Sequence, residues 1–130
     1  MTADDNAIER LAAAKYLLVT TFRRDGRAVP TPVWGFRDGD ALGIWTVAGS
    51  GKVKRIRNRG DVLLSECDVR GNPSGEEVPG HAEILGPRDT ARYRALLARK
   101  YGILARLGLL GSRLRRGREG VVGVRITLAR

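Results

Sequence analysis

The chain has 130 residues, the length of one domain, and 24 basic against 14 acidic side chains give it a formal net charge of +10. A single cysteine, Cys67, excludes an internal disulfide, and no apolar run approaches the length that crosses a membrane. Because the stretch from Thr2 to Arg10 is polar and acidic, unlike a signal peptide, we expect one cytoplasmic domain over residues 1–130.

The positive charge is concentrated in two segments. Residues 50–60 hold five basic and no acidic residues, and residues 88–118 hold ten basic and one acidic residue. The rest of the chain is net negative. Such localisation indicates an anionic partner, which leaves nucleic acid, an anionic membrane face and a polyanionic cofactor as alternatives.

The chain begins with a predicted helix and a predicted hairpin. Asp4, Asp5 and Asn6 are suited to cap a short helix that reaches about Lys15 and covers one end of a barrel. Residues 16–22 are rich in β-formers, and the Asp-Gly pair that follows them is typical of a hairpin turn.

The second strand is predicted over residues 28–36 and contains Pro30 and Pro32. Each proline lacks the N–H that would donate to a neighbouring strand. Part of this strand should therefore lie at a sheet edge, or face a ligand or a second subunit.

A third strand, residues 42–46, leads into a turn and a basic helix. Ser50 is a good N-cap, and Gly49 and Gly51 let the backbone approach a ligand, so the free N–H groups of the first turn can bind an oxyanion. The spacing is not that of a P-loop, which argues against nucleoside triphosphate hydrolysis. The pattern predicts a phosphate or carboxylate site, and the alternative is a solvated basic helix.

The remaining elements complete a barrel. Strands are predicted over 62–69, 78–85 and 121–128, and an amphipathic helix from Pro87 to Gly102 continues as a second piece to Leu114. Arg92, Arg94, Arg99 and Lys100 fall mostly on the polar face of that helix. Six strands with helical additions predict a small, mostly antiparallel barrel, whose interior side chains fill. A larger ligand must bind outside it or at a dimer seam.

Seven stretches of the sequence carry a resemblance to a known family: residues 15–22, 27–34, 44–46, 50–57, 69–73, 99–102 and 122–126. Together they resemble the flavin and deazaflavin oxidoreductases of the pyridoxamine-phosphate-oxidase-like split β-barrel superfamily, and are most similar to the branch that uses coenzyme F420. The resemblance implies a six-stranded split barrel of the FMN-binding type. It also implies a homodimer with two cofactor sites at the interface and hydride transfer to a small organic substrate.

The resemblance also implies site residues. The segment that holds the cofactor's phosphate matches Ser50, Gly51, Lys52, Val53 and Arg55, and Lys54 and Arg59 are close enough to attract its glutamate tail. The strand along the ring matches Thr31, Pro32, Val33 and Trp34, with Trp45 and Thr46 on its neighbour. Gly35 stands where the resemblance implies a larger residue, which would widen the substrate side.

No side chain is expected to act as a nucleophile, because a hydride-transferring cofactor brings its own reactive carbon. His81 reads as a strand residue and Cys67 as a packed thiol, and no Ser-His-Asp or metal-ligand spacing is present. We expect no catalytic side chain and no metal.

Two alternatives remain open. The same anion site would suit FMN or haem, whose phosphate or propionate it could hold. Alternatively, residues 88–118 could bind nucleic acid or an anionic membrane surface. The segment has few aromatics for stacking on bases, so nucleic acid is the less favoured of these partners. The segment from Arg113 to Arg118 is no part of the resemblance.

Overall fold

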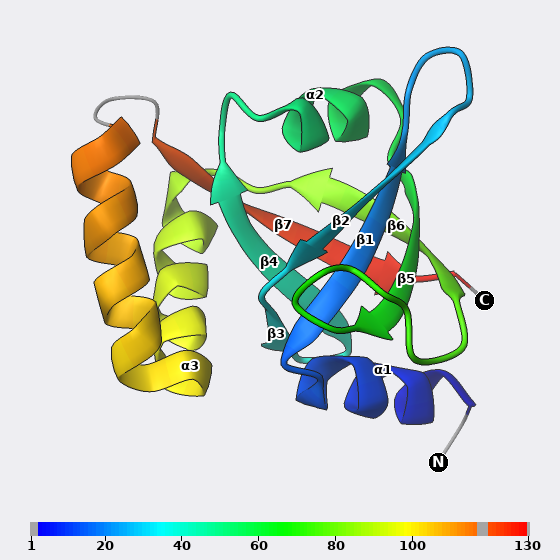
Figure 1. Cartoon of the computed structure of the whole chain (residues 1–130), viewed down its shortest axis with the longest axis horizontal. Helices are drawn as coiled ribbons and strands as arrows, with labels where there is room; N and C mark the ends of the chain where they lie inside the picture. Colours follow the sequence, from blue (N-terminus) through cyan, green and yellow to red (C-terminus); the bar gives the residue numbers. More distant parts are fainter. Residues whose placement is uncertain (1–2, 117–119, 130) are drawn as a thin grey trace.

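The computed structural model describes the backbone of residues 3–116 and 120–129 and the side chains of residues 6–102 and 120–129. It is mostly β, with helical additions around one curled antiparallel sheet (Figure 1). In chain order the elements are α1 (Ala3–Ala13), β1 (Tyr16–Phe22), β2 (Ala28–Val33), β3 (Gly35–Asp38), β4 (Ala41–Val47), α2 (Gly51–Asn58), β5 (Asp61–Cys67), β6 (Val78–Ile84), α3 (Pro87–Arg116) and β7 (Val121–Leu128).

The sheet has seven strands in the order β2-β1-β5-β6-β7-β4-β3, so the prediction of six strands was wrong. The segment predicted as one strand over 28–36 is divided at Trp34. Val33 pairs with Leu17 of β1, whereas Gly35 pairs with Ile44 of β4, so the chain leaves one edge of the sheet and enters the other. The prolines do lie on an edge strand, as their missing donors require.

Apolar side chains from strands all around the barrel fill its interior. Leu17, Val19, Leu42, Ile44, Leu64, Val124 and Ile126 are fully buried there. Helix α1 covers one end, at the bottom of Figure 1, and inserts Ile8 and Leu11 into the core. The predicted cap at Asp4, Asp5 and Asn6 was wrong, because the helix already begins at Ala3.

Helix α3 is two helices joined at Gly102, whose φ of 61° is a left-handed conformation that favours glycine. The interruption at this residue was predicted. The first piece packs Tyr93 and Leu97 against Phe36 on the outside of the barrel. The side chains of residues 103–119 lie outside the described part, so the apolar stripe to Leu114 and the segment from Arg113 to Arg118 stay predictions. Among the described residues, no helix has the length and apolarity needed to cross a bilayer.

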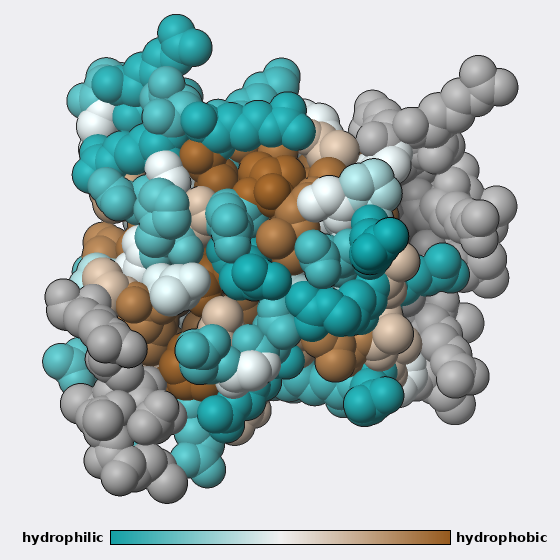
Figure 2. Space-filling view, turned by 180° about the vertical axis from the view of Figure 1, so that it is seen from behind, coloured by the Kyte–Doolittle hydropathy of each residue, from teal (hydrophilic) through white to brown (hydrophobic). Residues whose placement is uncertain are grey.

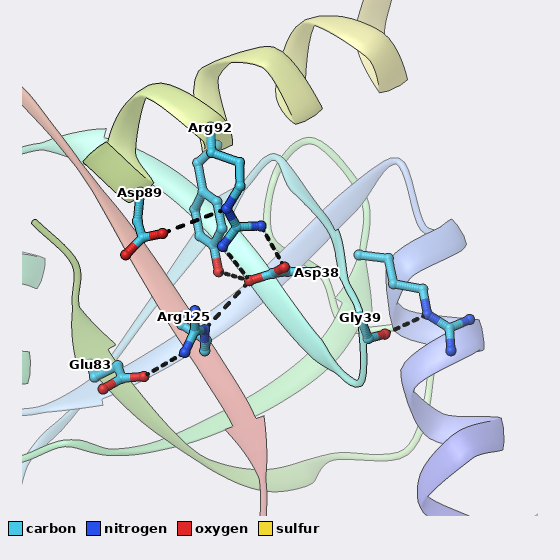
Figure 3. A network of polar contacts seen from close by, with 8 residues as sticks. Asp38, Gly39, Glu83, Asp89, Arg92 and Arg125 are labelled. Atoms are coloured by element: carbon cyan, nitrogen blue, oxygen red, sulfur yellow. Dashed lines mark hydrogen bonds and ion pairs between the residues drawn. The ribbon is translucent and has the colours of Figure 1, made fainter. Parts of the chain in front are cut away.

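A polar network ties α3 to the barrel wall (Figure 3). Asp38, at the end of β3, pairs with Arg92 at 2.7 Å and with Arg125 of β7 at 3.4 Å, and accepts a hydrogen bond from the Tyr93 hydroxyl. Arg125 also pairs with Glu83. The Arg92 hydrogen bond is the main cause that lowers the pKa of Asp38 to about 2. This network holds structure together, because each charge faces an opposite one.

Candidate functional site

The N-terminus of α2 has the geometry that the sequence predicted. Ser50 is extended, with φ −68° and ψ 157°, and its hydroxyl accepts a hydrogen bond from the N–H of Val53 at 3.3 Å. The N–H groups of Gly51 and Lys52, in the first turn, have no partner inside the helix. No acidic residue lies in this turn. Backbone dipoles and free donors therefore favour a negative group at this point.

Lys52 lies just inside this helix end and is only 9% exposed. None of the ion pairs in the described part of the chain involves it. Burial, and secondly the positive charge of Arg55, lower the pKa of its ammonium. A buried cation without an anion is unfavourable, and a bound anion beside it would relieve that cost.

Arg55 is held in place by the barrel. Its Nε donates to the hydroxyl of Thr21 at 2.6 Å, and Thr21 is fully buried in β1. The guanidinium then lies over the first turn of α2, where a Cβ on Gly51 would come within 2.7 Å of Nη1. Glycine at position 51 thus allows the arginine to stand beside the free N–H groups. The hydrogen bond leaves the other guanidinium nitrogens available to a ligand.

A groove of about 560 Å³ runs between α2 and the turn that joins β1 to β2. Its lining includes five cations, Arg23, Arg24, Arg27, Lys54 and Arg55, and a single acid, Asp25. Asp25 is already engaged, because Arg27 donates to it at 2.8 Å. In Figure 2 hydrophilic side chains gather over this turn and over α2, along the upper left of the view. The groove is therefore strongly cationic.

The hairpin arginines were missed by sequence reasoning, which treated residues 23–27 only as a turn. They lie beside α2 because β1 and β2 extend past the sheet and bring the turn over the helix (Figure 1). The only sequence signal was the number of arginines around an Asp-Gly turn. That signal does not specify which surface they face.

The other predicted residues fall in two places. On β2, Thr31 and Val33 are half-buried and Pro32 is exposed. Trp34 and Trp45 instead pack against the cluster that Phe36 forms with Tyr93 and Leu97 of α3. Thr46 follows Trp45 on β4 and is half-buried.

Arg59 is not among the residues that line the groove. Its guanidinium carbon lies 4.4 Å from the centre of the Phe22 ring, and its Nε lies 3.6 Å from Asp61. Phe22 does line the groove, so Arg59 stands next to it. The two central parts of the predicted phosphate segment, the capped helix end and Arg55, thus lie together, with the groove beside them.

The sequence matches no protein-family model and no curated protein. Among solved structures, an F420 reductase is similar with a TM-score of 0.67 and 24% identity, over 94% of this chain and 93% of that one. A proposed pyridoxamine 5′-phosphate oxidase from Listeria innocua has a TM-score of 0.68 at 13% identity, over 99% and 95%. A haem storage protein from Vibrio cholerae has a TM-score of 0.69 at 10% identity, over 100% and 92%.

Identities this low show the fold and not the activity. The likeness nevertheless covers nearly the whole length of this chain and of each of the three similar proteins. The chain therefore has the split β-barrel fold of the pyridoxamine-phosphate-oxidase-like proteins, with helical additions.

Proposed function

We propose that this protein binds the deazaflavin coenzyme F420 and acts as an oxidoreductase on a small unsaturated or quinone-like substrate. The observation that carries the proposal is the capped N-terminus of α2, where the anchored Arg55 stands beside the free N–H groups and the first turn also contains the buried Lys52. These groups would hold the phosphate of the cofactor.

The surplus of cations favours a ligand with more than one anionic group. A single phosphate would occupy the helix end and leave Arg23, Arg24 and Lys54 without partners. A cofactor with a glutamate tail supplies further carboxylates for the groove, whereas FMN has only its phosphate. The charge of the groove thus supports the deazaflavin over FMN. The F420 reductase among the similar structures points the same way, although its likeness concerns the fold.

The residues of this chain would bind the cofactor, orient its ring and shield the ring from water. When bound, the reduced cofactor would supply a hydride to the acceptor, and a proton from solvent would complete the reduction. Strand β2 would lie along the ring, where Pro30 and Pro32 leave the sheet edge short of donors. We further propose a homodimer whose second subunit covers this edge.

Fluorescence titration of the purified protein with oxidised F420 and, separately, with FMN tests the proposal. We expect F420 to bind at least about tenfold more tightly, since the groove adds charge-assisted contacts that FMN cannot make. The protein should then oxidise reduced F420 in the presence of a quinone, and the absorbance of F420 measures this reaction. If the protein binds FMN and not F420, the proposed cofactor is wrong. If it binds F420 but catalyses no reaction with any acceptor, it is a cofactor carrier and not an enzyme.

A further inference from the structure

Two interruptions of regular structure lie in contact at one corner of the barrel. One is Trp34, where the chain passes from β2 to β3, and the other is Gly102, where α3 divides. The residues just before Gly102, Lys100 and Tyr101, reach across to the residues at the first interruption. The proposed function so far gives this corner no role.

Lys100 binds three backbone carbonyls with its ammonium group. The distances from Nζ are 2.6 Å to Ala12, 2.8 Å to Ala14 and 2.6 Å to Gly35. Three N–H donors thus meet three acceptors, and the acceptors at Ala12 and Ala14 lie at the C-terminal end of α1, where a cation is favoured. Lys100 therefore joins α1, the start of β3 and α3.

Tyr101 joins the same corner in two ways. Its hydroxyl lies 2.9 Å from the carbonyl of Lys15 and 3.0 Å from that of Gly35, and burial raises its pKa to about 12, so it stays a donor. Its ring stacks on Trp34 with 4.4 Å between centroids and 8° between planes. One face of the indole is therefore covered and its plane is fixed.

Gly35 permits this arrangement. A Cβ at this position would lie 2.9 Å from Cδ2 of Leu17, so glycine lets the start of β3 pack closely against the Leu17 side chain. Its carbonyl accepts from both Lys100 and Tyr101. The Gly35–Phe36 peptide, one residue beyond Trp34, is therefore held by two consecutive residues of α3.

The corner lies at one end of the strand proposed to carry the ring. Arg55 is bonded to Thr21, which pairs with Val29 on β2. Trp34 lies five positions after Val29, roughly 16 Å at the rise of a strand. A ligand with its phosphate at α2 and its ring along β2 would thus extend toward Trp34.

We propose that Lys100 and Tyr101 are positioning residues that fix Trp34, and that Trp34 orients the planar ring of the bound cofactor. This inference rests on the proposed function, since the ring belongs to that ligand. Lys100 and Tyr101 of α3 would thus affect how the ring of the ligand is oriented, whereas the cations near α2 would affect how its anionic groups are bound.

The fixing of Trp34 is tested without ligand. In a Trp45→Phe background, Trp34 is the only tryptophan, and acrylamide quenching of its fluorescence reports its exposure. Lys100→Met should raise the quenching constant about twofold, because the carbonyls lose their donor and the corner opens to water. Lys100→Arg should restore much of the protection. The matched control Arg99→Met removes an exposed neighbouring cation and should leave quenching unchanged. Equal quenching constants in the Trp45→Phe protein with and without Lys100→Met would overturn the proposal.

The effect on the ring is tested by comparing two probes in the otherwise wild-type chain. Lys100→Met and Tyr101→Leu should weaken F420 binding about tenfold and leave the binding of tripolyphosphate, an anion without a ring, within twofold of wild type. Lys52→Ala should weaken both. Equal losses for both probes, or no loss for either, would contradict a positioning role. If the wild type binds tripolyphosphate but no F420, the proposed function fails, whereas unchanged quenching with normal F420 binding defeats only the positioning role.

Discussion

Two arginine-rich clusters of this protein have opposite surroundings. Beside α3, Arg92 and Arg125 face three acids, Asp38, Glu83 and Asp89, and the ion pairs join four elements, α3, β3, β6 and β7 (Figure 3). Beside α2, five cations line a groove that contains one acid. Both clusters are built from the same residue types on one small barrel.

The difference separates structural charge from ligand-binding charge. In the first cluster, the hydrogen bond between Arg92 and Asp38, and secondly their opposite charges, raise the pKa of Arg92 and lower that of Asp38, so the folded state favours the charged forms. In the second, burial and the nearby charge of Arg23 lower the pKa of Arg55, so the folded state disfavours its charge. Such a cluster stores an unfavourable interaction that an anion can remove.

The largest expected effect on stability comes from Asp38→Asn. The change leaves the Tyr93 hydroxyl and Arg125 with a neutral partner, and we expect a loss of about 2 kcal/mol in the free energy of unfolding. Urea denaturation measures this loss. Asp89→Asn is the matched control, because its contact with Arg92 is longer, at 3.6 Å, and exposed, so it should cost under about 0.5 kcal/mol. Anion affinity should not change in either variant.

Acid should have the same effect as this substitution. The folded pKa of Asp38 is about 2, below the usual 3.8, so its contribution is complete above the higher value and is lost as pH falls toward the lower one. The difference in unfolding free energy between wild type and Asp38→Asn should therefore shrink between pH 5 and pH 2. A difference that stays constant with pH would show that the carboxylate charge is not what stabilises the network.

Neutralising a cation of the groove should lower anion affinity and leave stability intact, the reverse of what is expected for Asp38→Asn. Arg24→Gln or Lys54→Gln should weaken polyanion binding by about two- to fivefold, more at low salt, and leave the free energy of unfolding unchanged or raised by up to about 0.5 kcal/mol. Isothermal calorimetry at two salt concentrations, paired with urea denaturation, measures both quantities. Arg57→Gln, an exposed cation of the same helix outside the groove lining, serves as the control. A clear loss of stability in Arg24→Gln would make this cluster structural as well.

Local signals in the sequence were sufficient for part of this account. The cap at Ser50 and the break at Gly102 follow from the residues at those positions, and the structure confirms both. The last strand, with Val124 and Ile126 in the core, follows from alternation.

The rest depends on contacts between distant segments. The division at Trp34 arises because the sheet nearly closes there, and no local pattern marks that point. The hairpin arginines become part of the site only through the approach of their turn to α2. Lys100 was predicted on the polar helix face, yet it reaches carbonyls of α1 and β3, because its long side chain can span to neighbouring elements.

The central claim is that the cations at the N-terminus of α2 are uncompensated until an anion binds. The most direct measurement is calorimetric titration of F420 into wild type, Lys52→Ala and Arg55→Ala, with the free energy of unfolding measured for the same three proteins. We predict that each substitution weakens binding roughly 10- to 100-fold, as the loss of a charge-assisted contact implies. Lys52→Ala should not lower stability, whereas Arg55→Ala should lower it by only about 1 kcal/mol, because the buried Thr21 hydroxyl loses its hydrogen bond. Unchanged affinity in both variants, or affinity lost only in proportion to stability, would contradict the account.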